Sequence, residues 1–284
     1  VLLQDTVHEA RTSTRNIFLY GVGSAYQLNA NHKVYTNYTR NYKSIHFSDM
    51  QIVNPNFKID ENLRDETGFN FELGSRGNIK EIFGYDLSVF YLYYHDRIGA
   101  VLEQDPFDLI LKRVRRNISD SRNIGVESYL EYDIWQSMIK DKSLYELILF
   151  TNVARIDARY VNSQEPAFQN KMVENVPKWN IKSGLNFKYK TLKISSQISY
   201  MSKQYTDATN AVESVPSAIY GEIPSYYILD LSSSYELKNN VTLETGVNNI
   251  TNNMYFTRRA VGYPGPGIIP SDGRNFYLTL QLIF

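Results

Sequence analysis

The cationic side chains of this sequence include three stretches with the chemistry to hold an anion. They are Lys112, Arg113, Arg115 and Arg116 in the first stretch, Arg155 and Arg159 in the second, and Arg258 and Arg259 in the third. A guanidinium keeps its charge and binds a carboxylate through two parallel hydrogen bonds. Convergent arginines would therefore suit a small carboxylate-rich complex, but the same side chains would also bind lipid phosphates or solvate loops. The sequence leaves these interpretations open.

Other residue patterns argue against catalysis and against a resident metal. The four His residues are scattered and form no HExxH motif, and the absence of Cys excludes thiol chemistry and Cys-ligated zinc. The GVG at Gly21–Gly23 is followed by no helix, so it is not a dinucleotide loop. Carboxylates such as Glu72, Glu127 and Asp230 fit a polar, water-filled face better than an acid–base pair. We expect a protein that is not an enzyme and carries no cofactor of its own.

Charge and composition narrow the class of protein further. Lys+Arg and Asp+Glu both number 30, so the sequence lacks the basic surplus expected of a nucleic-acid binder. No window of 18 apolar residues is present, so no transmembrane helix is expected. The chain nevertheless contains 23 Tyr residues, whose apolar ring and polar hydroxyl suit a membrane interface. This composition fits a membrane β-barrel or a soluble all-β protein.

Alternation of apolar and polar residues with a period of two recurs along the chain, whereas sustained helical periodicity does not. This pattern predicts eleven antiparallel strands. The predicted strands are Ile17–Leu28, Lys33–Phe47, Thr67–Ser75, Phe83–Leu102, Asn123–Trp135, Tyr145–Tyr160, Trp179–Tyr189, Leu192–Tyr205, Tyr226–Leu237, Val241–Arg258 and Arg274–Phe284.

The alternation also assigns the faces of the last strands. The residues expected to point outward into lipid are Tyr227, Leu229, Leu231, Phe276, Leu278, Leu280 and Leu282. Those expected to point into the lumen are Asp230, Ser232, Glu244, Thr279 and Gln281. Because successive side chains of a strand point to opposite faces, a slip of one residue would reverse every assignment.

The links between the predicted strands alternate between short and long along the whole chain. An outer-membrane barrel has this pattern, because its periplasmic turns are short and its extracellular loops are long. The final strand would then run from the outside to the periplasm. Bacterial barrels of this kind contain an even number of strands, so eleven strands imply that further strands precede Val1. No internal boundary is visible, and residues 1–284 are expected to form a single portion of a barrel.

Several segments, in order, resemble TonB-dependent outer-membrane receptors. They are Leu63–Gly77 (LRDETGFNFELGSRG), Phe83–Gly99 with its Tyr-rich YYHDRIG end, Arg122–Tyr132 (RNIGVESYLEY) and Val247–Tyr255 (VNNITNNMY). The resemblance extends over roughly Tyr20 to Phe284. The terminal Phe284, on the same strand as Leu280 and Leu282, resembles the signal that the barrel-assembly machinery reads.

The resemblance implies an all-β, up-and-down transmembrane barrel of 22 strands, plugged by an N-terminal domain that contacts TonB. This sequence would supply the eleven C-terminal strands, without the plug or the first strands. The implied function is ligand-gated import of a ferric siderophore or ferric-carboxylate chelate across the Gram-negative outer membrane. The implied partners are the chelate, TonB through the missing region, outer-membrane lipid and lipopolysaccharide, and the barrel-assembly machinery. Iron would enter only as part of the transported chelate.

The end of the chain, residues 255–281 (YFTRRAVGYPGPGIIPSDGRNFYLTLQ), resembles receptors of the ferric-dicitrate type from Bacteroidetes-like bacteria. The candidate ligand-binding residues are Arg113, Arg115, Arg116, Arg155, Arg258, Arg259 and Tyr263. Alternation along the predicted strand places Arg258 on the lumen side and Arg259 on the other side. A bulge among the Asn residues at 248–253 would exchange the two.

Four alternatives remain open from the sequence. They are a passive porin, a TonB-dependent receptor for a nutrient other than iron, a structural or adhesive barrel, and a soluble lectin-like sandwich. The sequence upstream of Val1 is the observation that best distinguishes the receptor from these alternatives. A plug with a coupling box favours the receptor, whereas a signal peptide within a few strands favours the porin.

Overall fold

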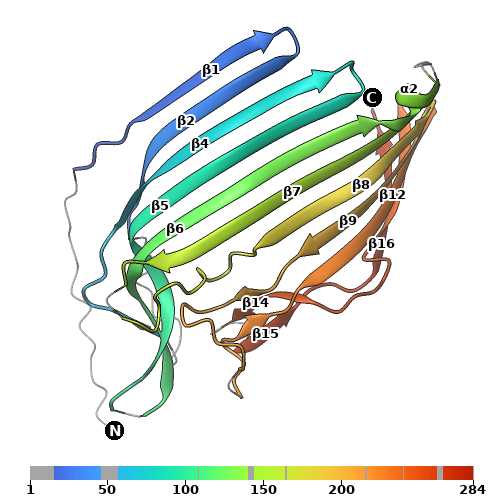
Figure 1. Ribbon diagram of the computed structural model, residues 1–284. Helices are drawn as coiled ribbons and strands as arrows, with labels where there is room; N and C mark the ends of the chain where they lie inside the picture. Colours follow the sequence, from blue (N-terminus) through green and yellow to red (C-terminus); the bar gives the residue numbers. More distant parts are fainter. Residues whose placement is uncertain are drawn as a thin grey trace.

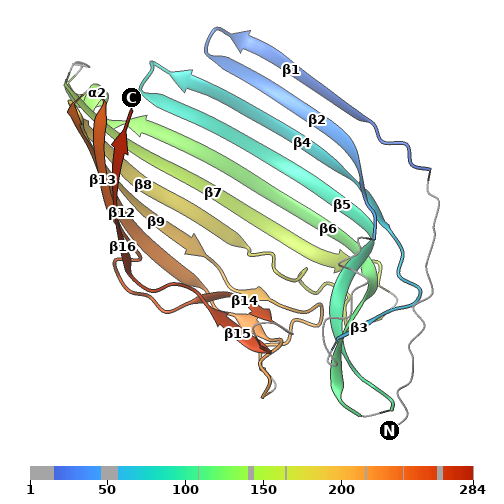
Figure 2. The same ribbon diagram turned by 180° about the vertical axis from the view of Figure 1, so that it is seen from behind.

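The protein is built around one curved antiparallel sheet, shown from two sides in Figures 1 and 2. The computed structural model describes residues 16–45, 57–107, 109–139, 144–163, 165–214, 216–238, 240–260 and 265–283. Along the sheet the strands follow chain order: β1 (Gly21–Asn29), β2 (His32–Lys43), β4 (Glu66–Ile79), β5 (Phe83–Gln104), β6 (Leu111–Asp133), β7 (Tyr145–Val161), β8 (Trp179–Tyr189), β9 (Leu192–Met201), β12 (Tyr226–Lys238), β13 (Val241–Asn248) and β16 (Asn275–Leu282). The predicted eleven-strand meander is confirmed, with β1 and β16 at the two edges.

Within the described residues, five shorter strands and one helix lie outside the eleven-strand path of the main sheet. Strand β3 (Phe57–Ile59) pairs in parallel with β6, β10 (Gln204–Tyr205) pairs with β11 (Glu222–Ile223), and β14 (Phe256–Ala260) pairs with β15 (Gly267–Pro270). Helix α2 (Ile134–Ile139) lies between β6 and β7. Among the described residues, no helix has the length and apolar character needed to cross a membrane.

The register of the last three strands confirms the predicted faces. Leu231, Val247 and Phe276 are aligned across β12, β13 and β16, and so are Ser234, Glu244 and Thr279 on the opposite face. In the apolar row, Leu231 is 41% and Phe276 73% exposed. Ser234 and Glu244 of the polar row border a hollow of about 480 Å³ on the concave face, to which β7 and β8 also contribute. The apolar side chains therefore point away from the lumen, as a lipid-facing wall requires.

The largest errors in the predicted strand boundaries lie at the outer end of the sheet. The strand predicted as Leu192–Tyr205 leaves the sheet at Met201, and the strand predicted as Val241–Arg258 leaves it at Asn248. Strand β6 begins at Leu111, twelve residues before its predicted start. At its other end β6 stops before Trp135, which lies in α2.

An asparagine turn ends β13. Asn249 adopts a left-handed backbone (φ 51°), which Asn tolerates better than most residues. Its side chain is buried, its Oδ1 accepts the Asn253 N–H at 2.9 Å, and its own N–H donates to Asp230 Oδ1 at 2.8 Å. These bonds replace the sheet ladder, so the chain turns out of the wall instead of continuing to Arg258.

We expect Asn249→Ala to destabilise the folded barrel by about 1–2 kcal/mol, because it removes buried hydrogen bonds and leaves a side chain that disfavours positive φ. Asn249→Gly relieves the backbone strain but still lacks the amide, so it should cost less. Denaturant unfolding of the full-length protein in lipid vesicles measures both. Equal stability of wild type and Asn249→Ala would contradict this account of the turn.

The β5–β6 pair extends far beyond the other hairpins, with β5 ending at Gln104 and β6 beginning at Leu111. At its tip the Asp105 carboxylate accepts the Phe107 N–H at 2.9 Å and the Lys112 ammonium at 2.8 Å, and these bonds lower the pKa of Asp105. The predicted 20-residue outer loop is therefore mostly strand. This outer link is shorter than the stretch between β6 and β7 that holds α2, so the predicted alternation of link lengths fails here.

Candidate ligand site at the outer mouth

A small hydrophobic cluster positions the elements at the outer mouth. Its buried members come from β5, β6, β7 and the segments that follow β7 and β9: Val101, Val114, Ile118, Ala158, Tyr160, Phe168, Val173 and Ala208. The cluster anchors the long hairpin against the segments at the end of the barrel wall. It thereby brings residues of β6 close to residues of β14.

Arg113, Arg258 and Arg259 line one hollow of about 360 Å³. The other lining residues are Asn175, Met201, Gln204, Thr206, Tyr226 and Thr257. Arg113 comes from β6 and the other two arginines from β14, so residues about 145 positions apart in the sequence share one site. The predicted convergence of the first and third cationic stretches is thus present for three of their members.

Arg113 is fixed in the wall of this hollow. Its guanidinium donates from Nη2 to the Thr206 carbonyl at 3.0 Å, and burial lowers the pKa of Arg113 from its usual value. The charge is retained, because an arginine pKa begins far above neutral pH. A half-buried guanidinium with donors remaining is a favourable partner for an anion, since a lower local dielectric strengthens the attraction.

The prediction that Arg258 and Arg259 face opposite sides of the wall is wrong. Both line the hollow, although only Arg258 was predicted to face inward. Arg259 donates to the carbonyls of Ala218 and Glu222, both at 3.0 Å, and stacks on the Phe256 ring at 5.1 Å. Burial also lowers the pKa of Arg259. This arginine therefore holds the surrounding loop in place.

Arg258 is exposed, and its side chain makes no hydrogen bond or ion pair within the described part of the chain. Its guanidinium is thus available to a ligand in the hollow. The reason for the changed orientation is the turn at Asn249, which separates β14 from the wall and removes the strand alternation on which the prediction depended.

The remaining members of the first stretch are engaged elsewhere. Arg116 forms ion pairs with Glu165 at 2.7 Å and Glu103 at 3.1 Å and lies over the Phe168 ring. The Arg115 carbonyl accepts the N–H of Asp60, beside the parallel pair of β3 and β6. Both residues brace the hairpin, and the structure does not place either of them in the hollow.

Arg155 lies on the opposite face from the predicted site. It aligns with Val126 on β6 and with Trp179 on β8, whose ring it covers at 5.5 Å. Val126 is 49% exposed on the outward, apolar face. Arg155 was predicted to contact the ligand, and this position rules out a contact from inside the lumen. Two other predicted residues, Tyr263 and Phe284, lie outside the described residues.

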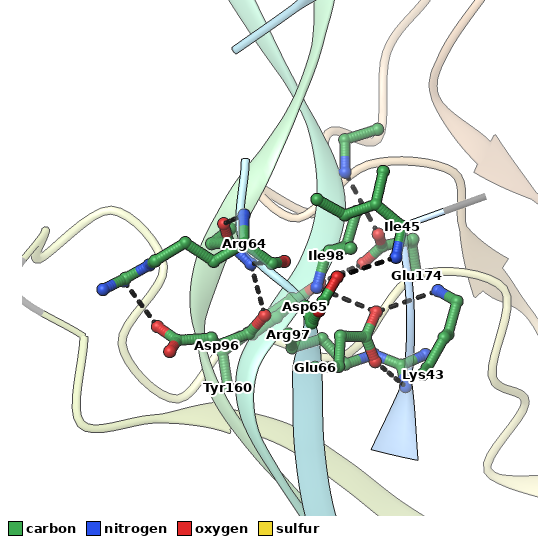
Figure 3. A network of polar contacts seen from close by, with 12 residues as sticks. Lys43, Ile45, Arg64, Asp65, Glu66, Asp96, Arg97, Ile98, Tyr160 and Glu174 are labelled. Carbon is green, nitrogen blue, oxygen red and sulfur yellow. Dashed lines mark hydrogen bonds and ion pairs between the residues drawn. The ribbon is translucent and has the colours of Figure 1, made fainter. Parts of the chain in front are cut away.

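A buried polar network joins the outer ends of β2 and β4 to β5, as Figure 3 shows. Glu66 is fully buried, and its Oε1 accepts the Lys43 ammonium at 2.9 Å and the Ile98 N–H at 3.0 Å. Arg97 lies 3.7 Å from the other carboxylate oxygen. Three neighbouring strands are thus joined through one carboxylate.

A second carboxylate, Glu174, extends the network to the end of β7. Its oxygens accept the Tyr160 hydroxyl at 2.5 Å and the Ala100 N–H at 3.2 Å, and burial raises the pKa of Tyr160 well above its usual value. Gly99 allows this close approach, because a Cβ there would lie 2.6 Å from the Tyr160 hydroxyl oxygen. Sequence reasoning missed Glu66 and Glu174, although Glu66 lies within the DETG part of the Leu63–Gly77 motif.

The sequence profile of the family described as "TonB dependent receptor-like, beta-barrel" matches residues 4–250, which is most of the chain. The chain belongs to this family. TonB-dependent receptor barrels are outer-membrane transport receptors rather than enzymes. No curated protein sequence matches the chain.

Solved receptor structures share the fold. The unliganded ferric citrate transporter FecA has a TM-score of 0.72 at 18% identity, over 93% of this chain and 38% of its own. The siderophore receptor PiuA from Acinetobacter baumannii has a TM-score of 0.65 at 19% identity, over 93% and 35%. The copper transporter OprC has a TM-score of 0.69 at 13% identity, over 92% and 39%. The chain therefore spans about two fifths of the length of these proteins, and the likeness concerns the fold.

Proposed function

We propose that this chain is the C-terminal part of a TonB-dependent receptor that imports an anionic ferric chelate. The observation that carries the proposal is the convergence of Arg113, Arg258 and Arg259 on one hollow at the outer mouth. Arg113 and Arg258 would pair with free carboxylates of the chelate, while Arg259 holds the loop that presents them. A plug and a TonB-contacting segment would come from the part of the receptor that precedes this chain.

The electrostatics of the hollow favour a carboxylate-rich ligand. No carboxylate side chain is among the described lining residues, so an incoming anion would meet the arginines directly, although Glu174 and Asp207 lie close enough to Arg113 to offset part of its charge. Arg113 contributes a half-buried side chain and Arg258 an exposed one. An anion is drawn to such a site from a distance and is then held by paired N–H donors. Of the chelate types, ferric complexes of citrate-like acids offer the free carboxylates that this arrangement would bind.

Arg258→Ala should weaken binding of ferric citrate by the full-length receptor by about 1.5 kcal/mol, or tenfold in Kd. The effect is modest because Arg258 is exposed, and water compensates in part for a lost surface contact. Arg258→Lys keeps the charge but loses the paired N–H donors of the guanidinium, so its affinity should lie between those of wild type and Arg258→Ala. Equilibrium binding to purified receptor in detergent measures the three proteins.

Arg40→Ala provides the matched control, because Arg40 is an exposed arginine on β2, far from the hollow. It should bind the chelate like wild type. If Arg258→Ala also binds like wild type while the barrel assembles normally, the proposed ligand contact is wrong. If the receptor conducts small solutes passively without energy coupling, the porin alternative replaces the proposal.

A further inference from the structure

A second group of basic residues lies on the outward face of the barrel, around a hollow of about 540 Å³. Arg155, Arg159 and Lys178 line it together with Trp179, and apolar residues of β6 form its other side. Arg122 is aligned with Arg159 across β6 and β7, so it belongs to the same face. This group, defined here as the outward basic cluster, has no role in the proposed chelate site.

The position of the cluster follows from the strand register. Ile124 and Val126 lie on the outward side of β6 and are 42% and 49% exposed at the boundary of the apolar wall. Trp179 is 39% exposed at the same level, where an amphipathic indole ring is favoured at a membrane interface. The basic side chains therefore lie at the outer rim of the apolar band, next to the level of lipid headgroups.

The acidic residues on this face are too few to neutralise the cluster. Asp157 accepts two hydrogen bonds from Arg159 Nε, at 2.9 and 3.1 Å, and lies 3.8 Å from Arg122. Asp120 lies further out and accepts the Tyr93 hydroxyl. Positive charge therefore remains on the side that faces the hollow.

Two of the basic side chains are available to a ligand. Arg155 and Lys178 are exposed, and within the described residues neither forms an ion pair. Arg155 lies over the Trp179 ring, which orients its guanidinium at the rim. The buried Arg122 Nε has no hydrogen-bond partner among the described residues, so the cluster offers further donor capacity.

We propose that the outward basic cluster binds the phosphorylated headgroup of an outer-leaflet glycolipid. Arg155 and Lys178 would hold the phosphate from two sides, since guanidinium and ammonium groups are strong phosphate partners. The acyl chains would extend over the apolar wall beside Val126. A lipid fits better than free phosphate, because the hollow opens outward and continues into that wall.

The test is binding of a bis-phosphorylated lipid A to full-length receptor by native mass spectrometry, for wild type and a protein carrying Arg155→Gln and Lys178→Gln. We expect the double variant to bind at least about tenfold more weakly, because two charge-assisted contacts are lost. The matched control carries Lys182→Gln and Lys193→Gln, which remove two exposed charges from the lumen side of β8 and β9. It should bind like wild type.

Dephosphorylated lipid A and inorganic phosphate complete the experiment. Both should bind wild type weakly, because the proposed site requires the phosphate and the acyl chains together. The proposal is overturned if the double variant retains wild-type affinity, if dephosphorylated lipid binds equally well, or if inorganic phosphate alone competes fully. Capture of a protein on this face, with no phosphorylated lipid bound, would also overturn it. Chelate binding by the double variant is a separate readout, so the two proposals fail independently.

Discussion

Leu280→Arg is expected to destabilise the barrel by about 2–4 kcal/mol, the cost of a cation on the lipid face near the bilayer midplane. Leu280 is 59% exposed on the outward face of β16 and is aligned with Leu243 of β13. In a membrane this exposed surface would contact acyl chains, which cannot hydrate a guanidinium. Denaturant unfolding of the full-length receptor in lipid vesicles measures the loss.

Thr279→Arg is the matched control, one residue away on the same strand. Thr279 is aligned with Glu244 on the polar face, so its guanidinium would enter a hydrated lumen beside a carboxylate. We expect a change of less than about 1 kcal/mol, in the range of surface ion pairs. If the two variants behave alike, or if Thr279→Arg is the more destabilising, the assignment of lipid and lumen faces is wrong.

Glu66→Ala is expected to lower the free energy of unfolding by about 3 kcal/mol, the low end for breaking a buried ion pair. The variant would remove the acceptor that Lys43 and the Ile98 N–H share and the carboxylate near Arg97. We expect a loss of unfolding free energy at the low end of this range because Lys43 and Arg97 keep partial access to water. The outer ends of β2, β4 and β5 should then exchange amide hydrogens faster.

Two further variants separate the parts of this effect. Glu66→Gln keeps an oxygen for the Ile98 N–H but loses the charge, so it should be intermediate in stability. Glu236→Ala removes an exposed carboxylate of β12 and should leave stability unchanged. Faster exchange spread evenly over the sheet, with no focus on the outer ends of those three strands, would argue against the role assigned to Glu66.

The strands and their faces were predictable from the sequence because both depend on local alternation. Tyr226–Leu237 alternates, Trp179–Tyr189 does so except at Ser183, and the structure places them in β12 and β8 with the expected neighbours. A barrel wall has one apolar and one polar environment along its whole length. The period of two therefore determines both the existence of a strand and its orientation.

The outer ends of the strands depend on contacts that are distant in the sequence. β13 ends where Asn249 binds Asp230, a residue of the neighbouring strand. β6 starts early because Val114 packs against Val101 and the cluster around Tyr160. A sequence window around Arg113 shows only a charged stretch, and charged stretches more often form loops than strands.

The candidate site was predictable in its chemistry but only partly in its members. Arg113 and Arg258 were predicted from residue type alone, and they share one hollow. Arg155 and Arg116 have the same side chain, yet one lies on the outward face and the other is paired with Glu103 and Glu165. Residue type identifies arginines that can bind an anion, whereas strand register and local acids decide which of them remain available.

Charge-selective uptake by cells expressing the full-length receptor tests the proposed function most directly. Isotope-labelled iron would be supplied as an anionic ferric citrate complex or as a neutral ferric hydroxamate complex, with and without TonB. We predict TonB-dependent uptake of the anionic complex, reduced by Arg258→Ala but not by Arg40→Ala, and little uptake of the neutral complex. Uptake of the neutral complex alone, or uptake of either complex without TonB, would contradict the proposal.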